Sequence, residues 1–300
     1  MKSQIIRGNT GLVGLLGNPV GHSFSPLIHN HVFAALGLDY VYIPLCVNES
    51  DIHTAMIALR AFHFAGANVT IPYKRKILPY CDILSPLSEI TGAVNTLYFR
   101  DGLMYGTTTD AEGFFKALES TGNDLAGGNI VIMGNGGIAR TLAYALALQK
   151  IPEKLTLIGR NSYKLKSLSS EIALKSGFFV DWNVFSSADI AHIMTNCSLL
   201  VNCTSVGMYP DVKYSPIDAA MLHEGMTVFD TIYNPSTTKL LSDASRAGCK
   251  VQNGLRMLLY QGLASQRLWT GVDVSADIVD LQEIRRLSDN SALDKTENAL

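Results

Sequence analysis

The stretch NIVIMGNGGIARTLAYAL, residues 129–146, decides the fold. It begins with a run typical of a buried strand and ends with an apolar helical pattern. The motif G-x-G-x-x-A, carried by Gly134, Gly136 and Ala139, lies between them. In this setting Gly134 allows a tight turn, Gly136 lets the backbone approach a pyrophosphate, and Ala139 keeps the helix close to the sheet. The helix start also favours a bound anion. The stretch therefore predicts dinucleotide binding rather than a merely glycine-rich turn.

The next predicted strand, within KLTLIGRNSYKLK at residues 154–166, indicates which dinucleotide is bound. Enzymes that use NAD usually end this strand with an acidic residue for the ribose diol, but here Gly159 stands at that place and Arg160 follows. No acidic side chain stands at this position to repel the 2′-phosphate of NADP. Arg160 can bind that phosphate through two hydrogen bonds or stack on the adenine. The alternative is that Arg160 and the lysines after it only form the solvated, basic start of a helix and bind no phosphate. We favour NADP.

Strand-like and helical runs alternate on both sides of this unit, which is typical of βαβ units around a largely parallel sheet. Before it we expect strands at residues 10–17, 40–47 and 66–72, and helices at 25–37, 51–62 and 111–120. Asp101-Gly102 between two short strand runs is a strong hairpin signal. The turn-rich run 121–128 marks a candidate domain boundary. After it we expect further strands at 154–159, 198–204 and 226–233, and helices at 137–148, 163–174 and 254–271.

Composition narrows the function classes. The 300 residues are 47% hydrophobic with a net charge of -2, which gives no general attraction to nucleic acid or an acidic membrane. The 5 cysteines are odd in number and have no C-x-x-C spacing, which argues against disulfides or a zinc site and fits a reducing compartment. Glycines and Pro19 interrupt the apolar run near the N-terminus, so neither a signal peptide nor a membrane span is expected. We expect a cytoplasmic protein without a metal and without nucleic-acid or membrane partners.

The stretch GNPVGHSFSP, residues 17–26, carries two hydroxyls in a tight turn. Ser25 and Pro26 are typical of a helix start, with Ser25 as N-cap and Pro26 at the first helical position, and Gly37 is expected to end that helix. Ser23, two residues earlier, is not explained by capping. Two hydroxyls and the backbone N–H groups of a helix start can also bind a small polyol or a carboxylate.

Seven motifs occur in the order found in shikimate dehydrogenases: GNPVGHSFSP, NVTIPYK, GAVNTL, TTDAEGF, GNGGIAR, NCTSVGM and NGLRMLLYQG. The chain resembles that family over about residues 11–265. The resemblance implies an α/β protein of two domains with the active site in a cleft between them, which reduces 3-dehydroshikimate reversibly to shikimate with NADPH. It implies a substrate-binding and catalytic domain at 1–113, a Rossmann-type NADP-binding domain at 114–253, helices at 254–287 that return to the first domain, and a polar tail at 288–300.

The resemblance also assigns roles to residues. Lys74 and Asp110 match the catalytic pair. The positions that match substrate contacts are Ser23, Ser25, Thr70, Asn95, Tyr233 and Gln261. Those that match cofactor contacts are Gly134, Asn135, Gly136, Gly137, Ile138, Arg160, Asn161, Lys164, Thr231 and Gly254. Many members of the family have Asn before the Thr-Asp pair, where this chain has Thr108, and many have Asn where this chain has Gly159.

The chemistry agrees with a Lys–Asp pair. Interconverting an alcohol and a ketone through a nicotinamide needs a proton donor at the oxygen, and no zinc constellation is apparent in the sequence. Taken alone, Lys74 would be a surface lysine at a strand end and Asp110 the N-cap of the following helix. A related enzyme acting on quinate or another cyclohexane carboxylate with NAD or NADP is the alternative function, and a non-catalytic ligand sensor is the rival from another class. We expect a monomer or a homodimer.

Overall fold

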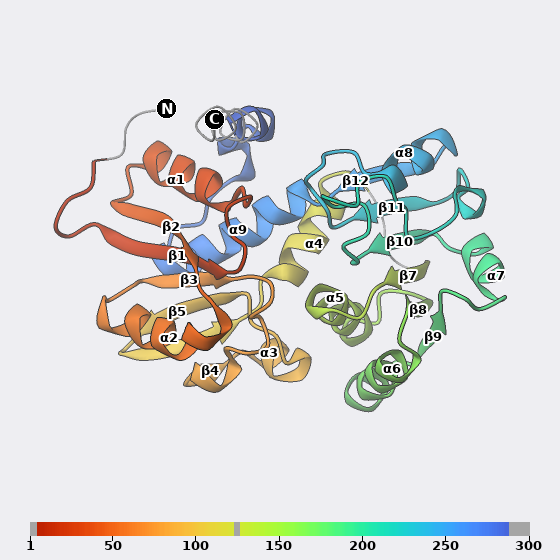
Figure 1. Ribbon diagram of the computed structural model, residues 1–300, viewed down its shortest axis with the longest axis horizontal. Coiled ribbons are helices and arrows are strands. Elements are labelled where there is room, and N and C mark those ends of the chain that lie inside the picture. The colour runs from red at the N-terminus through yellow and green to blue at the C-terminus, as the bar shows by residue number, and fades with distance from the viewer. Residues whose placement is uncertain (1–4, 123–126, 288–300) are drawn as a thin grey trace. The chain divides into compact units, whose positions relative to one another are not determined.

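The computed structural model describes residues 5–122 and 127–287. They form two compact units: the discontinuous unit runs up to Gly113 and resumes at Leu258, and the inserted unit runs from Phe114 to Met257. α4 (Asp110–Glu119) and α9 (Leu255–Thr270) carry the chain from one unit into the other (Figure 1). The division thus falls inside two continuous helices, between Gly113 and Phe114 in α4 and between Met257 and Leu258 in α9. The predicted tail, 288–300, lies outside the described residues.

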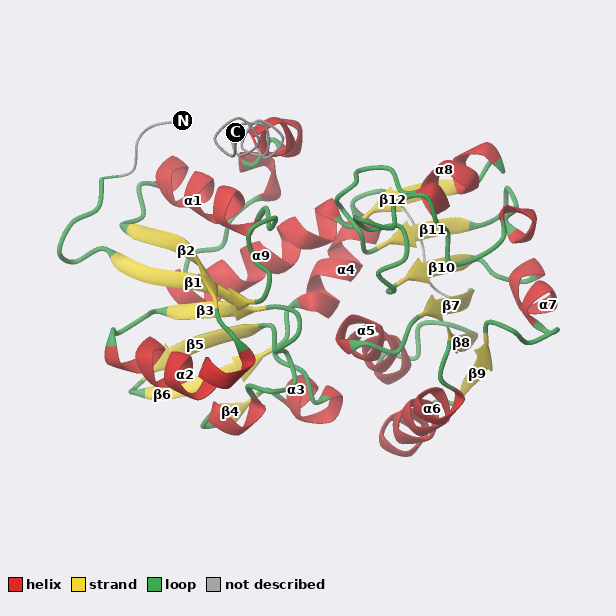
Figure 2. Cartoon of the chain, in the orientation of Figure 1, coloured by secondary structure: helices red, strands yellow, loops and turns green. Residues whose placement is uncertain are grey.

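The discontinuous unit contains a six-stranded sheet in the order β2-β1-β3-β5-β6-β4 (Figure 2). Its strands are β1 (Gly11–Gly17), β2 (Tyr40–Cys46), β3 (Gly66–Val69), β4 (Ile83–Leu84), β5 (Thr96–Arg100) and β6 (Leu103–Thr107). β1 is parallel to β2 and β3, whereas β5 is antiparallel to both β3 and β6. The carboxyl ends of β1, β3 and β6 and the amino end of β5 therefore share one edge of the sheet.

Helices cover both faces of this sheet because its strands are apolar on both sides. The helices are α1 (Ser25–Leu36), α2 (Ile52–Ala61) and α3 (Pro86–Thr91), together with the second half of α9. Val13 and Leu15 of β1 pack in one cluster with Phe33 of α1. Leu16, on the opposite face, packs in another cluster with Met56 of α2.

The predicted hairpin is confirmed. Arg100 and Leu103 pair across a two-residue turn, and its central residues Asp101 and Gly102 have φ values of 52° and 76°. Positive φ at both positions is the geometry that a two-residue turn needs to match the twist of its strands, and Asp-Gly adopts it readily.

The start of α1 corrects one prediction. Phe24 rather than Ser25 precedes the helix, and no side chain caps the helix start. Phe24 already has helical dihedrals, φ -80° and ψ -9°, so Ser25 is the first helical residue and Pro26 the second. The N–H of Ser25 donates instead to Ser23 Oγ at 3.2 Å. Gly37 ends the helix in the left-handed conformation, as predicted.

The inserted unit contains a six-stranded parallel sheet in the order β12-β11-β10-β7-β8-β9, which is the order of a Rossmann fold. Its strands are β7 (Asn129–Met133), β8 (Lys154–Gly159), β9 (Val180–Val184), β10 (Leu199–Asn202), β11 (Thr227–Asp230) and β12 (Lys250–Asn253). Its helices are α5 (Gly137–Leu148), α6 (Ser162–Ser176), α7 (Ile190–Thr195) and α8 (Lys239–Arg246), besides parts of α4 and α9. The sequence did not predict β9, β12, α7 or α8.

Short 3-10 helices connect several of these elements. They are η1 (Glu49–Asp51), η2 (Leu78–Tyr80), η3 (Ala219–Met221) and η4 (Ala276–Ile278). The two α/β units confirm the predicted fold class and the Rossmann assignment of the second half of the chain.

Candidate functional site

Lys74 and Asp110 form a salt bridge at the shared edge of the discontinuous sheet. Lys74 Nζ lies 2.6 Å from Asp110 Oδ2, and the two side chains are only 14% and 6% exposed. Lys74 lies in the turn that follows β3, and its carbonyl accepts a hydrogen bond from Val94 N at 2.8 Å. It is therefore held in place and largely shielded from solvent, unlike an ordinary surface lysine.

Asp110 is the first residue of α4 rather than its N-cap. The first intrahelical bond runs from Gly113 N to the carbonyl of Thr109, at 2.9 Å, which makes Thr109 the capping position. The Asp110 carboxylate is therefore free to accept hydrogen bonds from Lys74 and, at Oδ1, from Asn95 Nδ2 at 2.8 Å. A helix start also favours a negative charge.

Asn95 and Gln261 join the pair from two other elements. Asn95 precedes β5, and its Nδ2 also lies 3.1 Å from Gln261 Oε1, which α9 supplies. Both side chains are buried. The structure thus brings together four predicted residues whose sequence positions range from Lys74 to Gln261, in one buried polar cluster of donors and acceptors.

Ser23, Ser25 and Thr70 follow β1 and β3 at the same edge of the sheet. The ends of these two strands approach closely: a Cβ on Gly17 would lie 2.4 Å from Thr70 Cγ2, so only glycine fits there. Thr70 N donates to Leu16 O at 2.9 Å. Ser25 is buried, whereas Ser23 and Thr70 are half-buried. Tyr233, predicted to contact the same substrate, belongs to the inserted unit, where it follows β11.

The glycine motif forms the turn between β7 and α5, as predicted. Gly134 has a φ of +115°, and a Cβ there would lie 3.1 Å from the carbonyl oxygen of Cys203, so conformation and packing both require glycine. Gly136 precedes α5 with an ordinary φ of -77°, and a Cβ there would meet nothing within 4 Å. Protein packing therefore does not require glycine at 136. The space beside its backbone is the room that a pyrophosphate needs, so this loop fits a dinucleotide.

Asn135, Gly137 and Ile138 complete that turn and are half-buried. Beyond the next strand, Arg160, Asn161 and Lys164 are exposed at the carboxyl end of β8. Asn161 caps α6, because its Oδ1 accepts a hydrogen bond from Lys164 N at 3.0 Å. This cap fixes the start of α6, so that Arg160 lies between the end of β8 and the helix start.

A buried carboxylate that the sequence did not single out lies next to Thr231. Asp230 ends β11 and accepts hydrogen bonds from Thr238 Oγ1 at 2.6 Å and from Asn202 Nδ2 at 3.0 Å. Burial raises the pKa of Asp230 to about 6. Thr231 in turn donates from N and Oγ1 to Asn202 O, at 3.0 and 2.9 Å.

Gly254 lies against Thr231, where a Cβ would lie 2.1 Å from the Thr231 carbonyl oxygen. These contacts tie together the carboxyl ends of β10, β11 and β12. The only available sequence signal for Asp230 was its place at the end of an apolar strand, directly before Thr231, and that signal does not reveal burial.

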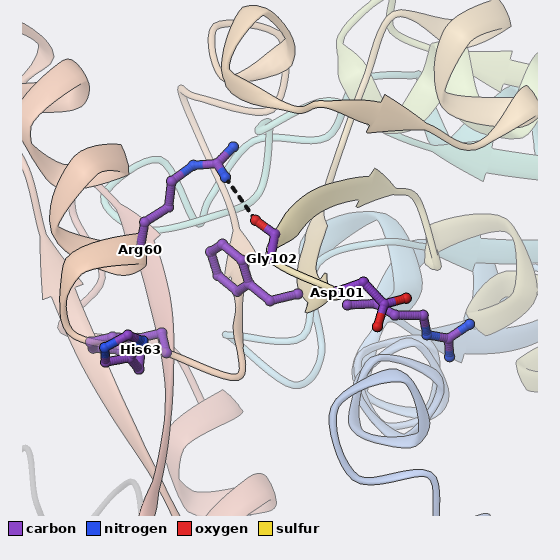
Figure 3. A pocket seen from close by; sticks show the side chains of 7 residues that line it. Arg60, His63, Asp101 and Gly102 are labelled. Atoms are coloured by element: carbon purple, nitrogen blue, oxygen red, sulfur yellow. Dashed lines mark hydrogen bonds between the residues drawn. The ribbon is translucent and has the colours of Figure 1, made fainter.

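An open cavity of about 440 Å³ lies elsewhere in the discontinuous unit (Figure 3). It is lined by Arg60, His63, Phe64, Phe99, Arg100, Asp101 and Gly102. Arg60 Nη1 donates to Gly102 O at 3.4 Å, and its Nη2 is paired with Asp82 at 2.6 Å. This cavity lies at the hairpin end of β5, opposite the end that carries Asn95, and it contains none of the predicted site residues.

Two further features bear on the class of protein. Within residues 5–122 and 127–287, no group of three or more His, Cys, Asp or Glu side chains is placed to hold a metal ion. Over the same described ranges, no helix is both long and apolar enough to cross a membrane.

Comparison with known proteins gives concordant results. Residues 15–97 match the family described as "Shikimate dehydrogenase substrate binding domain", and residues 254–280 match "Shikimate 5'-dehydrogenase C-terminal domain". The shikimate dehydrogenase (NADP(+)) of Methanothermobacter thermautotrophicus is 39% identical over 277 residues, which is 92% of this chain and 96% of that protein.

Solved structures agree with the sequence relatives. A crystal structure of a shikimate dehydrogenase in complex with NADP+ superposes with a TM-score of 0.87 at 35% identity, over 95% of this chain and 97% of that chain. The shikimate 5-dehydrogenase of Thermus thermophilus, in complex with NADP(H) and shikimate, superposes with a TM-score of 0.83 at 31% identity, over 93% of this chain and 99% of that chain.

Proposed function

This chain belongs to the shikimate dehydrogenase family, and from that premise we propose that it catalyses the reversible, NADPH-dependent reduction of 3-dehydroshikimate to shikimate. This reaction is a step of chorismate and aromatic amino acid biosynthesis. The observation that carries the proposal is the shielded Lys74–Asp110 salt bridge, with Asn95 and Gln261 beside it. A non-catalytic ligand sensor needs no such pair.

We assign the proton transfer to Lys74. NADPH, when bound, supplies the hydride that reduces the carbonyl carbon, and the oxygen then needs one proton. The ammonium of Lys74 donates it, and the amine regains a proton from solvent. Asp110 holds the ammonium at 2.6 Å and can hydrogen-bond the substrate hydroxyl.

Substrate binding is assigned to hydroxyl and amide groups at the same sheet edge. Ser23 and Ser25 are proposed to hold the carboxylate, as two hydroxyls next to the start of α1. Thr70, Asn95 and Gln261 are proposed to contact the ring hydroxyls, and Tyr233 is proposed as a further substrate contact. The presence of both serines favours shikimate over quinate, whose ring carbon carries an extra substituent.

The cofactor site is assigned to the inserted unit. The open space at Gly136 supports a pyrophosphate contact along residues 134–138. Exposed Arg160, with Asn161 and Lys164, is proposed to bind the 2′-phosphate. Thr231 and Gly254 are proposed to approach the nicotinamide. None of the 5 cysteines, all of which lie in the described residues, forms a disulfide; this suits a reducing compartment, and we place the enzyme in the cytoplasm.

A steady-state assay of the purified protein tests the proposal. It pairs shikimate or quinate with NADP+ or NAD+ and follows the absorbance of the reduced nicotinamide. We expect the highest kcat/KM for shikimate with NADP+. Preference for quinate would support the related activity, and a folded protein without turnover in any pairing would contradict the proposal.

The first prediction concerns Lys74. Lys74→Ala removes the proton donor and should lower kcat by on the order of a hundredfold or more. Arg75→Ala is the matched control, because Arg75 is the neighbouring cation and is exposed; it should stay within about twofold of wild type. Equal losses in both variants would show that a general positive charge, and not Lys74, matters.

A further inference from the structure

A buried hydroxyl cluster lies behind the catalytic pair. It consists of Thr96, Thr109 and Ser265, whose hydroxyl groups are hydrogen-bonded to one another. Thr96 and Ser265 have no exposed surface, and their Oγ atoms are 2.7 Å apart. Asn68 joins from β3, where its Nδ2 lies 3.0 Å from Ser265 Oγ and 3.2 Å from Thr96 Oγ1. These contacts connect β3, β5, the residue that precedes α4, and α9.

The cluster acts on Asn95, whose amide orientation is determined by its neighbours. Thr109 N can only donate, and it lies 2.9 Å from Asn95 Oδ1. The Asp110 carboxylate accepts, and it lies 2.8 Å from Asn95 Nδ2. Thr96 Oγ1 donates to Asn95 Oδ1 at 2.8 Å. With this orientation the amide presents its N–H groups to Asp110 and Gln261; the reverse orientation would place a carbonyl oxygen against a carboxylate.

The direction of the Thr96 proton is set by the rest of the cluster. Tyr42 OH donates to Asn68 Oδ1 at 2.9 Å, so the amino group of Asn68 faces the hydroxyls. Thr96 Oγ1 therefore receives hydrogen bonds from Asn68, and its own proton is directed to Asn95. With the Thr96 proton on Asn95, the proton in the 2.7 Å contact between Thr96 and Ser265 comes from Ser265. Ser265 Oγ also lies 2.9 Å from the carbonyl oxygen of Gln261, so its proton is shared between these two acceptors and the cluster is anchored to the helix that supplies Gln261.

We propose that Thr96 is a positioning residue for the reaction: its hydroxyl, held by Asn68 and Ser265, fixes the Asn95 amide that hydrogen-bonds Asp110. This inference rests on the proposed function. The Thr96 hydroxyl is hydrogen-bonded to Asn95 but to neither Lys74 nor any other residue proposed to contact the substrate, so its effect on catalysis passes through Asn95. Its methyl group, in contrast, only fills space in the core.

A pair of near-isosteric substitutions separates the hydroxyl from the methyl group. Thr96→Val keeps the shape and removes the hydroxyl, whereas Thr96→Ser keeps the hydroxyl and removes the methyl. We expect Thr96→Val to lower kcat/KM for shikimate by about five- to tenfold, the size of one net hydrogen bond. Thr96→Ser should keep kcat/KM within about twofold although it lowers the melting temperature, because it leaves a small void.

Thr141→Val is the matched control. Thr141 of α5 is equally buried, and its Oγ1 has no hydrogen-bond partner among the described residues, so the same substitution there should leave kcat/KM unchanged. If Thr96→Ser lost activity and Thr96→Val kept it, Thr96 would act by packing, and the inference would be overturned.

A second measurement separates this inference from the proposed function. Hydrogen exchange of the Asn95 side-chain amide, followed by NMR, should be slow in wild type and Thr96→Ser and at least about tenfold faster in Thr96→Val, since its orientation is no longer fixed. Absence of turnover in the wild type would contradict the proposed function alone. Unchanged exchange in Thr96→Val would overturn the positioning role whatever the activity.

Discussion

Arg160 is the residue through which we expect the inserted unit to distinguish NADP from NAD. It is exposed directly after β8, and that strand ends with Gly159 instead of an acidic residue. Arg160→Ala should raise the KM for NADP+ by about 10- to 100-fold, because charge-assisted hydrogen bonds to a phosphate are lost. The KM for NAD+ should change little. Initial-rate assays with both cofactors measure this difference.

The control for Arg160 lies at the opposite end of β8. Lys154 begins β8 at its other end and pairs with Asp181 at 2.8 Å on the surface. Lys154→Ala removes a cation of the same unit and should leave both KM values within about twofold, since exposed ion pairs contribute little. A proportional rise in both KM values for Arg160→Ala would mean that Arg160 does not recognise the 2′-phosphate.

At the scale of single residues, the sequence predicts a role for Arg160 but not for Thr96 or Asp230. Arg160 could be predicted because its signal is local: a strand end, a missing acid and a cation. Thr96 and Asp230 could not, since their roles depend on partners far away in the chain. Thr96 meets Ser265 across 169 positions, and Asp230 meets Asn202 across 28. The N-cap role of Ser25 was wrong because Phe24 had already adopted helical dihedrals.

At the scale of elements, the turn between β7 and α5 contains Gly136, where we expect ligand binding rather than protein packing to require a glycine. Gly136→Ala should leave the melting temperature nearly unchanged, because its Cβ would enter open space. It should nevertheless raise the KM for NADP+ at least about tenfold, since the added methyl takes room from the pyrophosphate. Thermal unfolding and initial rates, measured on the same preparation, test both halves of this prediction.

Gly254→Ala is the contrasting variant at the junction of β12 and α9. Its Cβ would lie 2.1 Å from a backbone oxygen that cannot move freely, so we expect a loss of stability of at least about 2 kcal/mol. If Gly136→Ala destabilised the protein as much as Gly254→Ala, the open space at Gly136 would not reflect a ligand site.

Elements with strong local patterns were predictable, and edge elements were not. The β5–β6 hairpin followed from Asp101-Gly102, and β7 and α5 followed from an apolar strand before a glycine motif. β12 is an edge strand of four residues, KVQN, with Val251 exposed, so it lacks the apolar run of a buried strand. α8 spans only eight residues, KLLSDASR, which is too short for a clear helical period.

At the scale of the whole molecule, the two units should respond to pH with opposite signs. Burial lowers the pKa of His29, in the discontinuous unit, to about 4, while its usual value is 6.5. Between these values the unfolded chain binds a proton that the folded unit does not, so stability falls as pH falls. Asp230, in the inserted unit, has a pKa raised to about 6, so its folded form binds a proton first and stability rises as pH falls.

From pH 7 to pH 5 we therefore expect the discontinuous unit to lose about 2 kcal/mol and the inserted unit to gain about 1 kcal/mol from these two groups. Native-state hydrogen exchange at both pH values, corrected for intrinsic exchange rates, measures each unit separately. Asp230→Asn should abolish the gain in the inserted unit and leave the other unit unaffected. A parallel loss in both units of the wild type would contradict the prediction.

The insertion of one unit into the other affects the order in which the protein is completed during synthesis. A ribosome produces the chain from its N-terminus, so all six strands of the inserted unit exist once Asn253 has been made. The discontinuous unit, although it begins first, must wait for the second half of α9. Until then Asn68, Asn95 and Thr96 lack Gln261 and Ser265 as partners, and burying them is unfavourable. The nucleotide-binding half of the nascent enzyme is thus finished before the half that precedes it.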